Sequence, residues 1–322
     1  MDVTPLVSIV IPAYRSERTI GGAIASALTQ TYENIEVVVC LDGVTDRSEA
    51  IVQGYGDLVT VIRQENRGVA AARNAAVAAS SGELIALLDA DDILLPAHVE
   101  SAVARWAARC VDKAYVTCNA FWLGRAGIVP RRTVLPRTAP PAEGHRLALL
   151  QRNLVSVQSL YPRAMHEELG GFDTQMRVLE DYDFWVRAAF AGWTTLYETE
   201  PTALYRRAGE SLSSELDHMA EYRHRMLRSV QATYADQLTD AERAYLDTAL
   251  SMETEDVHLR RGDEALRRGD REAAAQAFAA ASTLVPGDRR LRLKAMALRH
   301  LPSADRLYAW RERIRTGETE RA

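Results

Sequence analysis

The sequence predicts an α/β fold, in which a sheet is flanked by helices, followed by an all-helical C-terminal region. Residues 7–11 and 35–41 are apolar runs rich in β-branched side chains, and both end at residues that break strands. Between them, small and apolar side chains recur at helical spacing over residues 17–29. A strand, a helix and a strand in this order pack with a right-handed crossover, which makes the two strands parallel.

The same alternation continues along the next fifty residues or so. We expect a helix over 46–55 that begins at Asp46 and Ser48, a strand over 58–62, a helix over 69–80 and a strand over 84–88. In open sheets of this kind, ligands bind beyond the carboxyl ends of the strands. The residues at those ends are therefore the first candidates for a binding site, namely Pro12, Ala13, Tyr14, Asp42, Gly43, Gln64, Glu65, Asn66 and residues 89–92.

Residues 121–147 are rich in Pro, Gly and Arg and have little periodicity, which predicts a long irregular connection over the sheet. Helical signals resume near Leu147. A break between residues 210 and 217 precedes a region dominated by Ala, Arg, Leu and Glu, which are strong helix formers. We therefore expect a sheet domain over residues 1–212 and a helical region over residues 213–322.

Within the helical region, residues 255–288 are similar to one tetratricopeptide-type hairpin. The small, aromatic and proline positions of that repeat are occupied by Gly262, Ala265, Ala274, Phe278, Ala281 and Pro286. A single repeat cannot bury its own apolar face, and the sequence shows no further copies. A hairpin packed on the sheet domain, or on a second subunit in a homodimer, is therefore favoured over a peptide-binding array.

Residues 289–315 form a basic amphipathic end. They contain nine Lys or Arg and two Asp or Glu, and their apolar side chains recur at helical spacing. Such a segment can lie on an anionic membrane or bind an acidic partner. A solvated charged face over an ordinary core stripe is the favoured interpretation.

The chain has 322 residues and a formal net charge of −5, with 47% hydrophobic and 26% charged residues. These values are typical of a globular protein of enzyme size and argue against a general affinity for nucleic acid. The three cysteines are scattered without a C-x-x-C pair, which favours a reducing cytoplasm. No secretion signal and no run of 18 apolar residues is visible, so any membrane contact is expected to be peripheral.

Three carboxylates, those of Asp89, Asp91 and Asp92, lie close together directly after the predicted strand 84–88. Carboxylates this close repel one another unless a cation lies among them, and hard oxygen ligands suit Mg²⁺ or Mn²⁺ bound together with a diphosphate. Taken alone the cluster is weak evidence, because turns and helix caps also collect aspartate.

The cluster stands among several ordered motifs. They are Val7-Ser8-Ile9-Val10-Ile11-Pro12-Ala13-Tyr14, Leu41-Asp42-Gly43, the segment Asn66 to Asn74, Gly170-Gly171-Phe172-Asp173, and the segment Leu179 to Trp185. Together they resemble family 2 glycosyltransferases of the GT-A fold, over roughly residues 6–207. The resemblance implies a mixed sheet flanked by helices and an enzyme that takes its sugar from a nucleoside-diphosphate sugar.

The resemblance also implies a set of donor-binding residues. They are Pro12, Ala13, Tyr14, Glu17, Asp42, Asn66, Arg73, Asp89 and Ala90. The first three would line the base and ribose, and Asp42 would accept a base N–H, which favours uracil or thymine. Arg73 would lie near the diphosphate, where a guanidinium neutralises phosphate oxygens, and Asp89 would contact the ribose or the sugar.

Metal-binding and catalytic roles are implied in the same way. Asp91 would bind the Mg²⁺ or Mn²⁺ ion that bridges both phosphates, with Asp92 as a second candidate ligand. Asp181 would be the base that takes the proton from an acceptor hydroxyl, and Glu180 stands beside it in the catalytic pair. Attack from the face opposite the leaving diphosphate implies inversion at the anomeric carbon.

Structural interpretations of these residues stay open. Asp42 and Gly43 alone are typical of a turn, and Arg73 can pair with an acid on a helix surface. Acids in the first turn of a helix complement its dipole, which accounts equally for Glu180 and Asp181.

Two residues depart from the family pattern. Leu41 stands where many members have an acid, which leaves the base preference open. Ala208 stands where many have a His that completes the metal shell. The Gln-x-x-Arg-Trp motif of processive synthases is absent after Asp181, which favours transfer of single sugars.

From the residues and the resemblance together we expect a metal-dependent inverting transferase that uses a UDP-sugar. Its acceptor would be a hydroxyl of a glycan, a lipid-linked molecule or a natural product. It would act in the cytoplasm or at the inner face of the membrane. The alternative is a catalytically silent GT-A-like protein that binds partners through its helical region.

Overall fold

A computed structural model describes residues 4–124, 127–206, 216–251, 255–284 and 288–301. These residues group into two compact units. The first comprises residues 4–206 together with 230–242, and the second comprises 216–229 together with 243–301. The predicted domain boundary at residue 212 lies outside the described residues.

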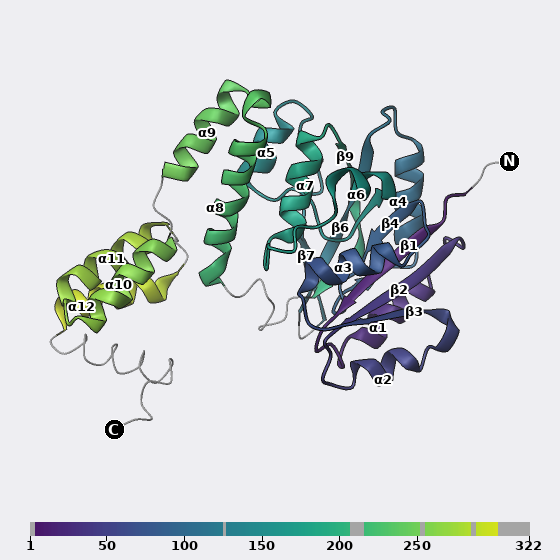
Figure 1. Cartoon of the computed structure of the whole chain (residues 1–322), viewed down its shortest axis with the longest axis horizontal. Coiled ribbons are helices and arrows are strands. Elements are labelled where there is room, and N and C mark those ends of the chain that lie inside the picture. The colour runs from purple at the N-terminus through teal and green to yellow at the C-terminus, as the bar shows by residue number, and fades with distance from the viewer. Residues whose placement is uncertain (1–3, 125–126, 207–215, 252–254, 285–287, 302–322) are drawn as a thin grey trace. The chain divides into compact units, whose positions relative to one another are not determined.

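The first unit contains a single mixed sheet (Figure 1). Its strands are β1 (Val7–Ala13), β2 (Ile35–Asp42), β3 (Thr60–Gln64), β4 (Leu84–Leu87), β5 (Ile93–Leu94), β6 (Ala114–Gly124), β7 (Gly127–Thr133), β8 (Ser159–Pro162) and β9 (Thr194–Arg206). Their order is β3-β2-β1-β4-β8-β6-β9-β5, and β7 pairs with β6. β1 runs parallel to β2 and β4, whereas β8 is antiparallel to both of its neighbours. The predicted mixed sheet is thus confirmed.

Helices flank this sheet, and further helices follow it in the described part of the C-terminal region. They are α1 (Ile20–Leu28), α2 (Ser48–Gln53), α3 (Val69–Ala78), α4 (His98–Ala107), α5 (His145–Gln151), α6 (Arg163–Leu169), α7 (Glu180–Phe190), α8 (Leu216–Thr233), α9 (Asp240–Ser251), α10 (Glu255–Arg267), α11 (Arg271–Leu284) and α12 (Arg289–His300). Short 3₁₀ turns lie at Gly56–Leu58 and Ala235–Gln237. Within the described ranges, none of the helices has the length and apolar character needed to cross a membrane.

The core of the sheet unit explains why its first strands were visible in the sequence. All seven residues of β1 are buried, and alternate residues from Val7 to Ala13 pack with the apolar face of α1. Strands that are buried on both faces read as continuous apolar runs. The same core takes alternate residues of β2 and β4, and it includes Val99, Ala102 and Val103 of α4.

The prediction of an irregular connection over 121–147 was wrong in part. The segment begins inside β6, and β7 follows as its antiparallel partner, with Phe121 opposite Thr133. β7 pairs only with β6 among the described strands, so it is an edge strand. Edge positions tolerate the proline and arginine residues that hid this strand in the sequence.

The second unit contains the predicted helical hairpin, formed by α10 and α11, with α12 packed against α11. Gly262 lies against the ring of Phe278, so closely that a Cβ at this position would be 2.6 Å from a ring carbon. Ala265, Ala274 and Ala281 are buried at their predicted small positions. The helical C-terminal region is therefore confirmed, while Pro286 and the basic end beyond residue 301 lie outside the described residues.

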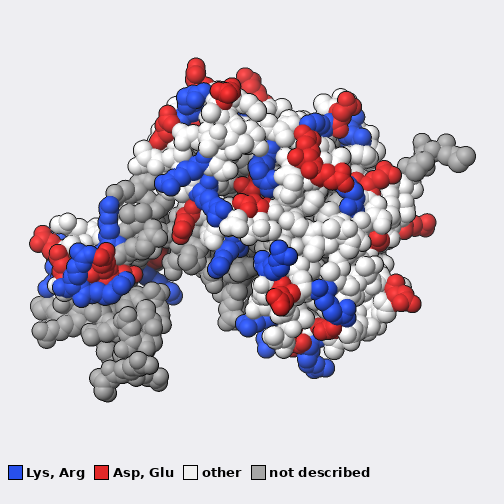
Figure 2. Space-filling model, in the orientation of Figure 1, with Lys and Arg blue, Asp and Glu red and all other residues white. Residues whose placement is uncertain are grey.

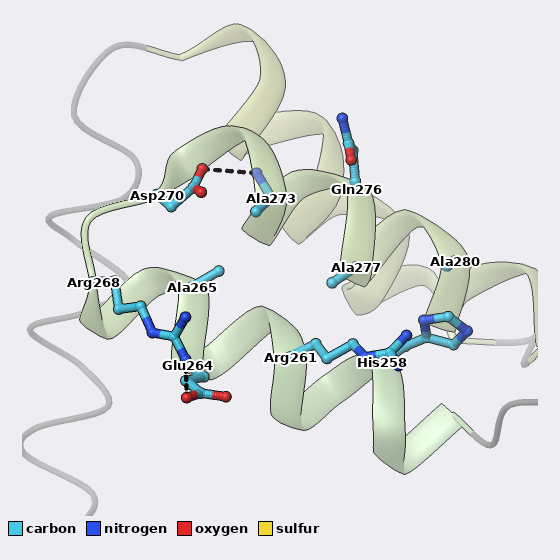
Figure 3. A pocket seen from close by; sticks show the side chains of 10 residues that line it. All are labelled: His258, Arg261, Glu264, Ala265, Arg268, Asp270, Ala273, Gln276, Ala277 and Ala280. Carbon is cyan, nitrogen blue, oxygen red and sulfur yellow. Dashed lines mark hydrogen bonds and ion pairs between the residues drawn. The ribbon is translucent and has the colours of Figure 1, made fainter.

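A groove of about 450 Å³ runs along α10 and α11 (Figure 3). Alanine side chains, among them Ala265 and Ala277, form its apolar part, and Arg261 and the ion-paired Arg268 and Glu264 lie along α10 beside them. All its lining residues belong to α10, α11 and the turn between them, so the acidic cluster after β4 contributes nothing to it.

One face of the molecule carries charged side chains of both signs. On the face of the molecule shown in Figure 2, acidic and basic side chains are interspersed and no broad field of one sign appears. This mixture of signs agrees with the small formal net charge of −5.

Candidate active site

The loops that follow β1 and β2 are locked together by reciprocal hydrogen bonds. The backbone N–H of Glu17 donates to the Asp46 carboxylate (3.1 Å), and the Glu17 carboxylate accepts from the backbone N–H of Arg47 (3.1 Å). The backbone N–H of Ser16 donates to Oγ of Ser48 (3.0 Å). Glu17, expected at the donor site, therefore joins the loop after β1 to the loop after β2.

The residues predicted to line the base differ in exposure. Pro12 and Ala13 are buried in β1, whereas Tyr14 is 45% exposed. The guanidinium of Arg15 lies over the Tyr14 ring, 5.1 Å from its centroid. The structure thus leaves one flat, accessible ring just beyond the end of β1, of the kind on which a base can stack.

Asp42 is buried and ties the end of β2 to the segment before α3. Its carboxylate accepts hydrogen bonds from Nε2 of Gln64 (2.7 Å) and from the backbone N–H groups of Arg67 (2.8 Å) and Gly68 (2.9 Å). A carboxylate has about four lone-pair sites, so three are filled and one is left. Asp42 therefore has the structural role in a turn that was one of its two interpretations. Its remaining lone pair is compatible with a contact to a base as well.

Gly43 and Asn66 explain why this turn needs glycine. Gly43 has a φ of 63°, and a Cβ there would lie 2.6 Å from the backbone nitrogen of Asn66. Asn66 itself is exposed. The close packing of these two backbones holds the Asn66 loop against the end of β2.

Arg73 of α3 joins two acids that are far apart in the sequence. Its Nη2 donates to Asp89 (2.7 Å), at the end of β4, and its Nη1 donates to Glu180 (2.6 Å), the first residue of α7. Only 2% of Arg73 is exposed, and its guanidinium lies 5.5 Å from the centroid of the Phe172 ring. The arginine therefore pairs with the buried Glu180 and the partly buried Asp89, both on other elements, and not with an acid on its own helix surface.

Burial and the mutual charges of Arg73, Glu180 and Asp181 shift the pKa values of these three groups. Burial lowers the pKa of the Arg73 guanidinium, but the charges of Asp89, Glu180 and Asp181 outweigh burial and raise the pKa overall. Burial raises the pKa of Glu180 to about 7, although the charge of Arg73 opposes the change. Burial also raises the pKa of Asp181, again against Arg73. A carboxylate whose pKa is raised in this way takes up a proton more readily, as a general base must.

Asp91 and Asp92 are adjacent but differ in their surroundings. Burial, together with the charge of Asp89, raises the pKa of Asp91 to about 6. In the described part of the chain, no other residue donates a hydrogen bond to the Asp91 carboxylate. Asp92 is 1% exposed and both of its carboxylate oxygens accept hydrogen bonds, one from Nε2 of Gln158 and one from the backbone N–H of Arg206 (2.7 Å).

This difference decides how the turn fits a divalent cation. No group of three metal-ligating side chains occurs among the described residues. Asp91 nevertheless supplies a carboxylate without a hydrogen-bond donor, beside Asp89 and close to the carboxyl end of β4. Mg²⁺ is commonly held by one or two carboxylates and by substrate phosphates and water, so the donor set fits such an ion. Ala208 lies outside the described residues.

Two residues with side chains adopt left-handed backbone conformations in the described part of the chain, and both lie at this site. Arg15 has a φ of 47°, and Leu179, the residue before α7, has a φ of 62°. Such conformations cost free energy and occur preferentially at functional sites. They mark the loop after β1 and the start of the helix that carries Glu180 and Asp181.

Tyr205 and Arg206, at the end of β9, were not predicted as site residues. Burial raises the pKa of Tyr205, and the charges of Asp89, Asp92, Asp181 and Asp91 raise it further. The phenol thus lies within electrostatic reach of the acids from both sides of the site. The sequence contains these residues at the end of the recognised stretch, but β9 itself had no strand prediction.

Asn74 was also missed, although it lies one residue after Arg73. Its side-chain amide donates to the backbone oxygen of Phe172 (2.8 Å) and accepts from the backbone N–H of the same residue (2.9 Å). Gly171, with a φ of 76°, allows this approach, because a Cβ there would lie 2.7 Å from Oδ1 of Asn74. This clamp fastens α3 to the turn before α7.

The profile described as Glycosyl transferase family 2 matches residues 8–170, about half of the chain and most of the sheet unit. The chain belongs to glycosyltransferase family 2. Relatives in this family include an uncharacterized glycosyltransferase of Rickettsia prowazekii (strain Madrid E), 28% identical over 224 residues, which are 68% of this chain and 70% of that relative. Another, from Rickettsia felis, is 33% identical over 188 residues, or 57% of this chain and 31% of the relative.

Solved structures share the fold of this chain. S. aureus TarS 1-349 has a TM-score of 0.57 at 20% identity, over 98% of this chain and 93% of that chain. The mannosyltransferase PcManGT from Pyrobaculum calidifontis has a TM-score of 0.56 at 19% identity, over 95% and 83%. The predicted resemblance to family 2 and the GT-A fold are therefore confirmed.

Proposed function

We propose that this family 2 member transfers a single sugar from a nucleoside-diphosphate sugar, with UDP as the preferred nucleotide, to an acceptor hydroxyl, with inversion and with a divalent cation. The observation that carries the proposal is the buried Arg73, which pairs with Asp89 at the end of β4 and with Glu180 at the start of α7. The guanidinium of Arg73 thereby joins the expected donor side and the expected catalytic side in a single network of ion pairs.

The nature of the donor is supported by the loops after β1 and β2 and by the structural neighbours. The neighbours include TarS in complex with UDP and with UDP-GlcNAc, and PcManGT in complex with GDP-Man and Mn²⁺. In this chain Tyr14 would stack on the base, and Asp42 would use its remaining lone pair for a base N–H. Asn66 and the buried Ala90 would border the same site.

The ion would be held by Asp91, with water and phosphate oxygens as its other ligands. When bound, Mg²⁺ or Mn²⁺ neutralises charge that develops on the leaving diphosphate. Asp89, fixed by Arg73, would contact the ribose or the sugar. Because Arg73 is almost fully buried and bonded to two acids, its role would be to hold these carboxylates in place and to add positive potential near the phosphates.

Asp181 would act as the general base. One of its oxygens accepts a hydrogen bond from the backbone N–H of Tyr182 (2.7 Å), which orients the carboxylate. It would remove the proton of the acceptor hydroxyl as that oxygen bonds to the anomeric carbon. The bond from this carbon to the phosphate oxygen breaks with its electrons, and the nucleoside diphosphate leaves from the opposite face.

The acceptor would be a glycan, a lipid-linked molecule or a small natural product. An acceptor at an anionic membrane is supported by α12, a basic helix on which Leu293 and Met296 are exposed. Co-sedimentation with vesicles of phosphatidylglycerol at low salt tests this contact. Protein that stays in the supernatant would remove the support for a membrane acceptor and leave the transfer reaction unaffected.

Calorimetric titration with UDP, dTDP and GDP, each with Mn²⁺ and again with a chelator, tests the proposal as a whole. We expect UDP to bind and the chelator to weaken its binding, after which UDP-sugars are screened for release of UDP. A preference for dTDP or GDP would keep the reaction and change the nucleotide. Absence of binding by all three would favour the silent scaffold.

A further inference from the structure

We propose that Asp92 is a positioning residue for Asp91, which it holds by tying the turn 89–92 to the end of β9 and to the segment before β8. The inference rests on the proposed function, in which Asp91 binds the divalent cation. It gives Asp92 a role different from that of a second metal ligand.

Asp92 is buried, and both of its carboxylate oxygens accept hydrogen bonds from groups of the protein. It is 1% exposed, one carboxylate oxygen accepts from the backbone N–H of Arg206 (2.7 Å), and the other accepts from the side-chain amide of Gln158. Its own backbone N–H donates to the backbone oxygen of Asp89 (3.0 Å), which closes the turn. A carboxylate that is bonded in this way on both oxygens joins elements of the protein and does not face a ligand.

Arg206 makes a second hydrogen bond to the same turn. Its Nε donates to the backbone oxygen of Asp91 (2.7 Å), while its backbone N–H holds Asp92. Two adjacent residues of the turn are thus fixed by one residue at the carboxyl end of β9. Asp91 is held through its own backbone oxygen, and the residue that follows it is held through the Asp92 carboxylate.

Gln158 is itself held in the orientation that Asp92 needs. The amide oxygen of Gln158 accepts a hydrogen bond from Oγ of Ser156, which turns its NH₂ group toward Asp92. The backbone N–H of Ser156 donates in turn to Oγ1 of Thr117 (2.9 Å) in β6. The chain of bonds therefore runs from the turn into the middle of the sheet, where all these side chains are buried.

Such support matters for a hard cation, because its ligands must be placed within a few tenths of an ångström. Loss of residues that orient metal ligands commonly costs about 10–100-fold in metal affinity. Removal of the Asp92 carboxylate would also leave the donors of Gln158 and Arg206 buried without an acceptor.

The test compares four variants of the full chain, Asp91→Asn, Asp92→Ala, Asp92→Asn and Gln158→Leu. Mn²⁺ is titrated in the presence of saturating UDP, and free Mn²⁺ is measured by electron paramagnetic resonance. We expect affinity to fall by at least about 10-fold in D91N and D92A. D92N should rescue affinity to within about threefold of wild type, since its amide oxygen still accepts from Arg206 and Gln158 can rotate its amide.

The Gln158→Leu variant removes the partner without touching any acid. It should lower Mn²⁺ affinity, as D92A does. The double variant should bind Mn²⁺ no more weakly than D92A alone, because both changes break the same hydrogen bond between Gln158 and Asp92. A loss in D92N as large as that in D91N would identify Asp92 as a ligand and overturn the proposal. Full affinity in D92A would overturn it as well.

A second measurement needs no metal. Amide hydrogen exchange of the metal-free protein should be faster at residues 91–93 in D92A and Q158L, and unchanged there in D91N. Unchanged exchange in both D92A and Q158L would overturn the positioning role. Absence of Mn²⁺ and UDP binding by the wild-type protein would instead overturn the proposed function, so the two failures are distinguishable.

Discussion

At the scale of single residues, the site is organised by acids that are placed in different surroundings. Asp89 is paired with Arg73, Asp92 accepts one hydrogen bond on each carboxylate oxygen, and Asp91 receives no hydrogen bond from another described residue. Neighbouring carboxylates of one turn therefore have different chemistry. The sequence shows three aspartates of equal appearance, and only their partners distinguish them.

Replacement of Asp181 by Asn should lower kcat by about 10²-fold or more while UDP binding by calorimetry stays near the wild-type value, because only proton removal is lost. The matched control is Asp183→Asn on the same helix, since Asp183 is ion-paired with Arg187 (2.7 Å). D183N should lower the melting temperature more than kcat. An equal loss of UDP binding and kcat in D181N would indicate a structural role for Asp181.

Replacement of Asp91 by Asn should stabilise the metal-free protein at pH 8. The pKa of Asp91 is raised to about 6 in the folded chain, above its ordinary value of 3.8, so folding favours the protonated form. The stability that this provides is present at low pH and is lost as the pH rises through 6. The ionised carboxylate therefore costs the wild type about 1–3 kcal/mol at pH 8, a cost that Asn does not have.

Urea denaturation with a chelator checks this expectation at pH 8 and at pH 5. The advantage of D91N should shrink at pH 5, where the folded wild type keeps its proton. An advantage that is the same at both values would show that packing, and not charge, is responsible. A less stable D91N at pH 8 would contradict the raised pKa.

At the scale of elements, the carboxyl ends of β1, β2 and β4 bring together loops that the sequence separates by tens of residues. Hydrogen bonds between the loops after β1 and β2, and the clamp from Asn74 to Phe172, fix their relative positions. The geometry of the site thus depends on turns with glycine at specific places.

Replacement of Gly171 by Ala tests the clamp. The substitution places a Cβ 2.7 Å from Oδ1 of Asn74 at a φ of 76°, so we expect a loss of about 2–4 kcal/mol in the free energy of unfolding. Gly170 is the matched control, because its φ is 70° but nothing lies within 4 Å of a Cβ there. G170A should cost only about 1–2 kcal/mol. Equal losses in the two variants, measured by urea denaturation, would show that the clamp is dispensable.

The elements that the sequence predicted well are those whose pattern is local. The first two strands were predicted to within two residues, because buried parallel strands are continuous apolar runs. β7 was missed because an edge strand tolerates proline and arginine. The partners of Arg73 and Asp92 could not be predicted in the same way, since Glu180 lies 107 residues from Arg73 and Arg206 lies 114 residues from Asp92.

The family resemblance predicted site residues that local patterns could not, but it did not predict their surroundings. It assigned Asp91 to the metal, Asp92 as a second candidate ligand and Asp181 as the base. It gave no signal that Asp92 is enclosed or that Tyr205 lies near all of these acids. Such differences depend on burial and hydrogen bonding, which arise only when β8 pairs with β4 and β9 pairs with β5.

At the scale of the whole molecule, the sheet unit includes residues from beyond its last strand. Tyr234 stacks on Phe190 of α7, with ring centroids 4.7 Å apart, and Glu242 forms an ion pair with Arg146 of α5 (2.5 Å). Residues 230–242 therefore belong to the sheet unit by their contacts, whereas residues 243–301 belong to the other unit.

Truncation after residue 251 should consequently preserve the sheet unit better than truncation after residue 212. The shorter chain loses the aromatic contact at Phe190 and leaves Arg146 without its partner, for which we expect a loss of about 2–4 kcal/mol. Thermal unfolding followed by circular dichroism, with limited proteolysis, compares the two chains. Equal melting temperatures would show that residues 213–251 add nothing to the sheet unit.

The sheet order has a consequence for the exchange of parts between relatives. β3, β2, β1 and β4 are neighbours in the sheet and are also encoded without interruption by residues 7–87. The loops after β1, β2 and β3 that are proposed to read the nucleotide belong to this segment, and the turn 89–92 follows it directly, whereas Asp181 and the proposed acceptor side are encoded later. A crossover between genes near the codons for β5 would pass on the proposed nucleotide-binding segment as one piece. Under the proposed function, nucleotide preference and acceptor preference are therefore encoded by separate segments of this chain.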